Sequence, residues 1–223
     1  MARNYLLDSV ASRVSSLKSS HTIRVAIDGV DAAGKTTLAD ELADRLRQLG
    51  RLVVRSGIDG FHRPRQDRYA RGFDCPEGYY HDSFNLDGLV ETLLRPLGPG
   101  GTGYYRTAIF DYRKEMPVES PKTKVELEAI LLFDGIFLLR PQLRSFWEYT
   151  IFVRAQFDET LRRALVRDLP LWADAKKIEQ RYLSRYIPGQ KLYLAECNPE
   201  KNADLVIDNN DPSNPFVARS LIN

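Results

Sequence analysis

The residues best suited to chemistry lie near the N-terminus, in the stretch DGVDAAGKTT at positions 28–37. Gly29, Gly34, Lys35 and Thr36 fit the pattern G-x-x-x-x-G-K-[ST]. In such a loop the glycines let backbone N–H groups converge on phosphates, the lysine reaches the β and γ oxygens, and the threonine hydroxyl ligates Mg²⁺. We therefore expect a bound nucleoside triphosphate with Mg²⁺. The residues expected to contact it are Gly29, Asp31, Ala32, Ala33, Gly34, Lys35, Thr36 and Thr37.

Two aspartates follow runs that are typical of strands. Asp59 ends RLVVRSGID (51–59), and Asp134 follows the apolar part of AILLFDG (129–135). Ligands of doubly wound sheets bind at the carboxyl ends of the strands, so both acids are expected beside the phosphates. Asp59 could accept a proton from an attacking hydroxyl or join the magnesium shell, and the simpler alternative is an aspartate that caps the next turn. Asp134 has the position of the sheet-end acid that holds Mg²⁺.

A basic helix pattern follows in FDETLRRALVRD (157–168), where Arg163 and Arg167 share one face. These arginines could close over a nucleotide and stabilise charge on a transferred phosphoryl group. The alternative is a solvated helix face that pairs with its own acids. The sequence alone favours neither.

Two long segments contain aromatic and charged residues: 61–83 has little periodicity, and 95–117 begins with a turn-rich cluster and could continue as a hairpin. Loops of this length are usually functional or disordered, and the aromatic content favours function. His81 and Asp82 in the first segment could read a substrate, although a lone loop histidine is more often solvated. The aromatic side chains could line a small-molecule pocket or form a small core of their own.

The elements that must hold these residues alternate along the chain. Five strands are predicted, at 22–29, 51–59, 129–135, 149–153 and 203–208. Helical patterns occupy 36–50, 86–95, 157–168 and 177–196. Such alternation predicts a three-layer α/β domain with a five-stranded parallel sheet.

The rest of the chain fits one domain over 1–223, with an N-terminal helix at about 3–18 and a lid at about 167–181. The 32 basic and 30 acidic residues leave a net charge of +2, so nothing global indicates nucleic acid or an anionic membrane as partner. The first twenty residues contain no apolar run suited to a signal peptide. We therefore expect a cytoplasmic protein.

The order of motifs resembles the uridine kinase, phosphoribulokinase and bacterial pantothenate kinase family of phosphate-loop (P-loop) kinases. The matching segments are IDGVDAAGKTTLADELA, IDGFHRPR, YYHDSFNLDGL, YRTAIFDY, ILLFDGIF, FVRAQFDETLRRALVRD and NADLVIDN, which together span residues 23–209. The resemblance implies transfer of the ATP γ-phosphate to a hydroxyl of a small metabolite. It also implies homo-oligomers.

The resemblance assigns roles residue by residue. Asp59 matches the catalytic base, Lys35 the phosphate-loop lysine and Arg167 a lid arginine, while Thr36, Asp59 and Asp134 match the magnesium shell. Arg163 falls beside the nucleotide. The positions that fall in the acceptor region are His62, Tyr80, His81, Asp82, Arg106 and Phe110.

The acceptor region also departs from the uridine kinases. Tyr80 stands where their ribose-binding aspartate is expected, Phe110 where their stacking tyrosine is, and Glu115 where their base-reading histidine is. The segment DGFHRP resembles the pantothenate and sugar kinase variants instead. The acceptor is therefore expected to be a nucleoside or a molecule of the sugar or pantothenate type.

Two other classes of function compete with a kinase. A nucleotide-dependent switch or partner-binding ATPase would need no acceptor, but the guanine-reading N-K-x-D segment of GTPases is missing, since KNAD has the wrong order. A binding protein that has lost activity is disfavoured because Lys35, Thr36, Asp59 and Asp134 are all present.

Overall fold

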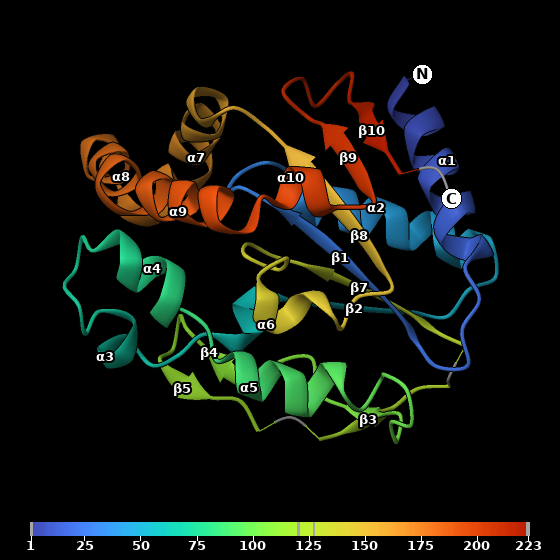
Figure 1. The fold of residues 1–223 in the computed structure, drawn as a ribbon. Helices are drawn as coiled ribbons and strands as arrows, with labels where there is room; N and C mark the ends of the chain where they lie inside the picture. The colour runs from blue at the N-terminus through green and yellow to red at the C-terminus, as the bar shows by residue number, and fades with distance from the viewer. Residues whose placement is uncertain (1, 120, 127, 222–223) are drawn as a thin grey trace.

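The computed structural model describes residues 2–119, 121–126 and 128–221, and among them one six-stranded sheet forms the centre of the molecule (Figure 1). In spatial order its strands are β10 (Phe216–Ser220), β9 (Leu205–Asp208), β8 (Tyr149–Arg154), β1 (Ile23–Gly29), β7 (Ile130–Asp134) and β2 (Val53–Gly57). All neighbours run parallel except β10, which pairs antiparallel with β9. The five predicted parallel strands are thus confirmed, and the prediction of a five-stranded sheet misses β10.

Helices cover both faces of the sheet, which gives the predicted three layers. The longer helices are α1 (Ala2–Ser16), α2 (Lys35–Gln48), α7 (Phe157–Trp172), α8 (Ala175–Arg181) and α9 (Ile187–Cys197). The short ones are η1 (Ile58–Phe61, a 3-10 turn), α3 (Arg65–Arg68), α4 (Pro76–Asp82), α5 (Leu86–Leu89), α6 (Pro141–Arg144) and α10 (Pro199–Asn202). Two π-helical turns, η2 (Val90–Leu94) and η3 (Tyr182–Tyr186), continue α5 and join α8 to α9.

The core is divided by the sheet because successive side chains of a strand point to opposite faces. Val25 and Ile27 of β1 pack with α1 and α2 on one face, whereas Ala26 faces the cluster that contains Phe133 and Phe137. The expected N-terminal helix is α1, and its buried side carries Leu6, Leu7, Val10 and Val14. The apolar packing on both faces of the sheet therefore fixes the positions of the ends of β1, β7 and β2.

That register brings the predicted site together at one edge of the sheet. Asp134 at the end of β7 pairs with Ile27 of β1 and with Gly57 of β2. The chain leaves β1 toward α2 and β2 on one side and returns to β8 on the other, so β1 lies at the topological switch point where ligands bind.

The segments expected to be loops carry more structure than predicted. The stretch 61–83 contains α3 and α4, whereas the hairpin expected within 95–117 is confirmed as β4 (Phe110–Asp111) and β5 (Met116–Pro117). A second small pair joins β3 (Tyr104–Tyr105) to β6 (Thr123–Lys124). The predicted break between the helical patterns 157–168 and 177–196 is wrong for most of its length, because α7 continues through Pro170 to Trp172 and α8 begins at Ala175. A proline in the last turn removes only one helical hydrogen bond, so the helix tolerates it.

Candidate active site

The phosphate loop joins β1 to α2 through backbone conformations that require small residues. Ala32 and Gly34 have positive φ values of 55° and 92°, which turn successive amides toward one side of the loop. A Cβ on Gly34 would lie 2.6 Å from Nδ2 of Asn209, and one on Gly29 would lie 2.4 Å from the carbonyl oxygen of Val153. These positions therefore accept only glycine, and the N-terminus of α2 faces the space where phosphates bind in such loops.

Lys35 lies at the centre of the site. Its side chain is buried and its Nζ donates to the carbonyl oxygen of Val30 at 2.7 Å. Burial lowers the pKa of Lys35, and four surrounding carboxylates oppose that change. In order of their effect on its pKa these are Asp31, Asp28, Asp134 and Asp59. The acids predicted from separate strands thus act on the same lysine.

Thr36 and Asp134 offer oxygen atoms suited to Mg²⁺. The Thr36 hydroxyl donates to Oδ2 of Asp134 at 2.6 Å, and Arg55 pairs with Oδ1 at 2.9 Å. No group of three or more His, Cys, Asp or Glu side chains able to cage a metal occurs within residues 2–119, 121–126 and 128–221. Mg²⁺ usually binds one or two carboxylates together with substrate phosphates, so the donor set fits Mg²⁺ bound with a nucleotide.

Asp59, predicted to end the second strand, lies in the 3-10 turn η1 because β2 already ends at Gly57. Its side chain remains accessible to solvent, yet the protein around it raises the pKa of the carboxyl by burial. His62 acts to lower this pKa, while the negative charges of Asp31 and Asp134 raise it further. His62 Nδ1 donates to the Asp59 carbonyl oxygen at 3.0 Å, and its ring lies 4.7 Å from that of Phe84 and 4.5 Å from that of Tyr112.

Two arginines of α7 contact loops at the site: Arg167 contacts the phosphate loop, and Arg163 contacts the loop after β9. Arg167 pairs with Asp31 at 3.2 Å and with Asp168 at 2.6 Å. Burial acts to raise the pKa of Asp31, but the charges of Arg167 and Lys35 outweigh it and the pKa is lowered. Arg163 pairs with Glu159 and donates to the carbonyl oxygens of Asn209 and Asn210, in the loop after β9.

The candidate acceptor residues do not form one group. Tyr80 and Phe110 are buried, and the Tyr80 hydroxyl lies 3.3 Å from the Cys197 sulfur. His81 is exposed, and Asp82 pairs with Arg71 at 2.7 Å. Arg106 is partly buried. Among the six candidates, His62 is hydrogen-bonded to Asp59, through the Asp59 backbone carbonyl.

A cavity of about 250 Å³ opens beside His62. It is lined by His62, Arg65, Arg68, Tyr69, Tyr79, Ser83, Tyr112, Glu115, Trp172, Arg185 and Tyr186. The aromatic loops therefore form a pocket wall in part, as well as packing on the core through Tyr80 and Phe110. We call this space the acceptor cavity.

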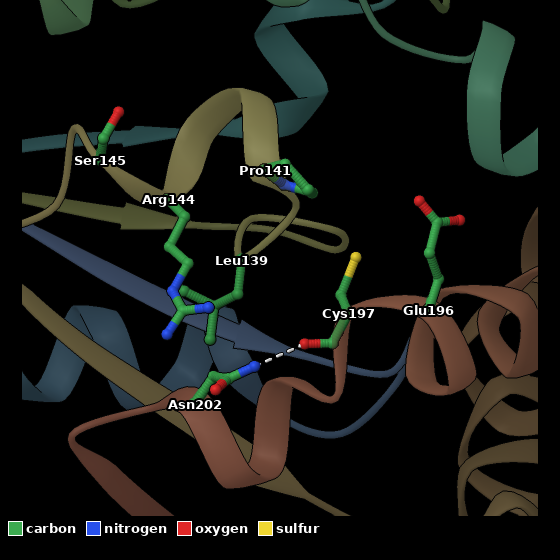
Figure 2. Close-up of a pocket in the computed structure, with 7 residues that line it drawn as sticks. All are labelled: Leu139, Pro141, Arg144, Ser145, Glu196, Cys197 and Asn202. Atoms are coloured by element: carbon green, nitrogen blue, oxygen red, sulfur yellow. Dashed lines mark hydrogen bonds between the residues drawn. The ribbon is translucent and has the colours of Figure 1, made fainter.

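A larger cavity of about 560 Å³ lies between α6, α9 and α10 (Figure 2). Leu139, Pro141, Arg144 and Ser145 approach it from one side, and Glu196, Cys197 and Asn202 from the other. Asn202 donates to the Cys197 carbonyl oxygen at 2.8 Å. None of the predicted site residues lines this cavity, so its size does not make it the reaction site.

Several residues of the site escaped the sequence reasoning. Asp28 is fully buried at the end of β1 and accepts a hydrogen bond from the Tyr193 hydroxyl. The Asp31 N–H donates to the side-chain oxygen of Gln190, and the Tyr182 hydroxyl donates to Asp31. One signal was available, since Tyr182, Tyr186, Gln190 and Tyr193 recur at helical spacing and mark a polar aromatic face.

Known relatives and structures agree with this geometry. Uridine-cytidine kinase B of Dictyostelium discoideum is 31% identical over 157 residues, covering 68% of this chain and 60% of that protein. The uridine kinase of Chlamydia pneumoniae is 26% identical over 195 residues, covering 83% of this chain and 81% of that protein. The chain thus spans less than two thirds of the Dictyostelium relative.

A solved structure of a possible uridine kinase from Bacillus stearothermophilus superposes with a TM-score of 0.73 at 21% identity, over 92% of this chain and 99% of that one. No protein-family model matches the chain. At 21% identity the likeness to this solved structure shows the fold, and the fold together with the phosphate loop defines a P-loop nucleotide-binding domain. The curated relatives to which this chain is similar are named uridine kinase or uridine-cytidine kinase.

Proposed function

We propose that this chain is a Mg·ATP-dependent phosphotransferase that moves the γ-phosphate of ATP to a hydroxyl of a small metabolite. The observation that carries the proposal is the convergence of Asp59, Asp134 and Asp31 on Lys35, with Arg167 held against Asp31. Positioning and charge stabilisation supply most of the catalysis in phosphoryl transfer, and this arrangement offers both.

Each group has a separate task in the proposed reaction. The loop amides and Lys35 hold the phosphates, and Arg167 neutralises charge on the transferred group. Thr36 and Asp134 would hold Mg²⁺, with Asp59 within its shell, and the ion would neutralise negative charge on the phosphate oxygens. Arg163 supports the loop after β9, which in related kinases lies against the adenine.

Asp59 is proposed as the base. Its carboxylate accepts the proton of the acceptor hydroxyl as the oxygen attacks phosphorus, and the bond from the γ-phosphorus to the bridging oxygen breaks with ADP as leaving group. The acceptor cavity beside His62 is the proposed site of the acceptor molecule. A raised pKa suits this role, because it makes the carboxylate a stronger base.

The proposal extends to the cellular location and the partners of the protein. It includes a cytoplasmic location, a small-molecule substrate and no nucleic-acid partner, and it allows a homo-oligomer. No helix within the described residues has the length and apolar character to cross a bilayer.

The base assignment predicts the behaviour of Asp59→Asn. ATP should bind with little change, because the loop and Lys35 remain, while kcat should fall by about 10²–10⁴ because the proton acceptor is lost. Equilibrium titration with ATP and a coupled assay of ADP release measure the two quantities. Asp87→Asn is the matched control, since Asp87 is an exposed carboxyl on α5. Unchanged turnover in Asp59→Asn would remove the base assignment.

A further inference from the structure

Four arginines gather around the ring of Tyr69, at the wall of the acceptor cavity. Arg65 and Arg68 come from α3, Arg181 from the end of α8 and Arg185 from η3. Their guanidinium carbons lie 4.6–5.6 Å from the centre of the Tyr69 ring. We call these residues the arginine cluster.

The cluster contains more positive than negative charge. Glu115 pairs with Arg68, and Asp74 pairs with Arg181 at 3.2 Å. Arg65 and Arg185 have no carboxylate within ion-pair distance among the described residues. Two cations of the cluster therefore lack a counter-ion.

The missing counter-ion costs more free energy at Arg185 than at Arg65, because Arg185 is only 2% exposed. It donates to the carbonyl oxygens of Arg68, Gly72, Phe73 and Cys75. Its Nε is buried without a partner. Carbonyl dipoles solvate a cation but do not neutralise it, and buried charges are normally paired.

The cluster faces the same space as the proposed base. Arg65, Arg68 and Arg185 line the acceptor cavity, as does His62, which bonds to Asp59. Tyr79 lines it as well, and after burial the carboxylates of Asp31 and Asp59 are among the causes that raise the pKa of Tyr79. The cavity therefore lies next to Asp59, with His62 between its lining and the Asp59 backbone.

We infer that the acceptor carries an anionic group, a carboxylate or a phosphate monoester, which binds the arginine cluster while its hydroxyl lies at Asp59. This inference rests on the proposed function and narrows it from any hydroxylated metabolite to hydroxy acids or sugar phosphates. Guanidinium groups bind both anions through paired N–H donors.

A purely structural role for the cluster would explain the contacts of Arg185 but not the position of Arg65. Arg185 does tie the segment 68–75 to η3, and that task alone would account for its carbonyl contacts. It would not account for Arg65, whose exposed guanidinium makes no ion pair in the described chain and still lines the cavity.

The test compares each anionic acceptor with an analogue in which a neutral hydroxyl or hydroxymethyl group replaces the anionic group. Binding of D-glycerate and glycerol, pantothenate and panthenol, and ribulose 5-phosphate and ribulose is measured by calorimetry with Mg²⁺ and a non-hydrolysable ATP analogue present. We expect one anion at least to bind about tenfold or more tightly than its neutral partner, since a charged hydrogen bond of about 1.5–3 kcal/mol corresponds to that factor. The carboxylate and phosphate pairs show which anion the site accepts.

Variants then assign the effect to the cluster. Arg65→Gln should weaken the anion about tenfold and leave the neutral partner unchanged, and Arg185→Lys should retain more affinity than Arg185→Gln. Arg95→Gln, which removes an exposed arginine paired with Glu91, is the control. Because Arg65 is exposed, its variant is expected to fold even where Arg185→Gln does not.

The two proposals fail separately. If no anion binds more tightly than its neutral partner, or if Arg65→Gln and Arg95→Gln behave alike, the anionic acceptor is wrong whether or not turnover occurs. If anions bind in this way but no acceptor stimulates ADP release, the inference about binding stands and the kinase proposal fails.

Discussion

At the scale of single residues, the site is governed by how much negative charge surrounds one lysine. Lys35 is acted on by four carboxylates, of which Asp31 is also paired with Arg167. Nucleotide phosphates add further negative charge to this space, so Arg167 and Mg²⁺ are needed to offset it. The contacts of Asp31 with Arg167 and Tyr182 join the phosphate loop to the helices above it.

The pH dependence of activity follows from Asp59. Its carboxyl must be ionised to accept a proton, and its pKa is raised chiefly by burial. Activity should therefore be lost as the pH falls through a value above the ordinary aspartate range of about 3.9. The measurement is kcat/KM for the acceptor at saturating Mg·ATP, with circular dichroism at each pH to verify folding. Full activity down to pH 4 in folded protein would contradict the raised pKa.

The residues of the site differ in how far the sequence revealed them. The phosphate loop is a local pattern, so eight neighbouring positions could be predicted from one motif. The neighbours of Asp28 and Arg185 could not be predicted. Tyr193 contacts Asp28, and the segment 68–75 contacts Arg185, only because the tertiary fold brings them together. Tyr80 was expected in the acceptor region, but its ring packs in the core against Phe137.

At the scale of elements, the continuous helical segment 175–197 connects both halves of the site. Its π-helical turn η3 presents Tyr182 toward Asp31 and Arg185 toward the acceptor cavity. Such turns inside α-helices often occur at functional sites. Further along, Tyr193 of α9 holds the end of β1.

Tyr193→Phe tests this connection between α9 and the sheet. The Tyr193 hydroxyl donates to Asp28 and accepts from the Leu139 N–H at 3.0 Å. Removing it takes this partner from the buried Leu139 N–H and from Oδ2 of Asp28, whose Oδ1 still accepts from the Gly29 N–H, so the free energy of unfolding should fall by about 2–4 kcal/mol. Urea denaturation measures the change, with Tyr104→Phe at an exposed position as control. A loss below about 0.5 kcal/mol would show that the hydroxyl is not a structural tie.

The elements were predictable where hydrophobic pattern decides structure. The apolar runs at β7 and β8 gave the parallel core, since buried parallel strands are continuously hydrophobic. Strand β10 escaped because its residues are exposed or half-buried and its position depends on pairing with β9. The helices α3 and α4 are too short for a periodic signal.

At the scale of the whole molecule, different elements form the donor side and the acceptor side of the proposed site. The phosphate loop, α2 and the loop after β9 form the proposed donor side, and α3, α4 and η3 form the acceptor cavity. Helices α7, α8 and α9 lie together beside the carboxyl edge of the sheet, with α4 facing α9 (Figure 1). Asp59, in η1 directly after β2, is among the carboxylates around Lys35, and its backbone carbonyl accepts a hydrogen bond from His62 of the cavity wall. The proposed transfer to a second small molecule requires such a position.

The most direct test is ADP release from Mg·ATP with and without a panel of hydroxylated acceptors, which includes nucleosides, pantothenate, ribulose 5-phosphate and simple sugars. We predict that ADP release rises with one class of acceptor, saturates with its concentration and matches the phosphorylated acceptor mole for mole. ATP hydrolysis that proceeds at the same rate whatever acceptor is present would contradict the account and favour a nucleotide-dependent switch or a partner-binding ATPase.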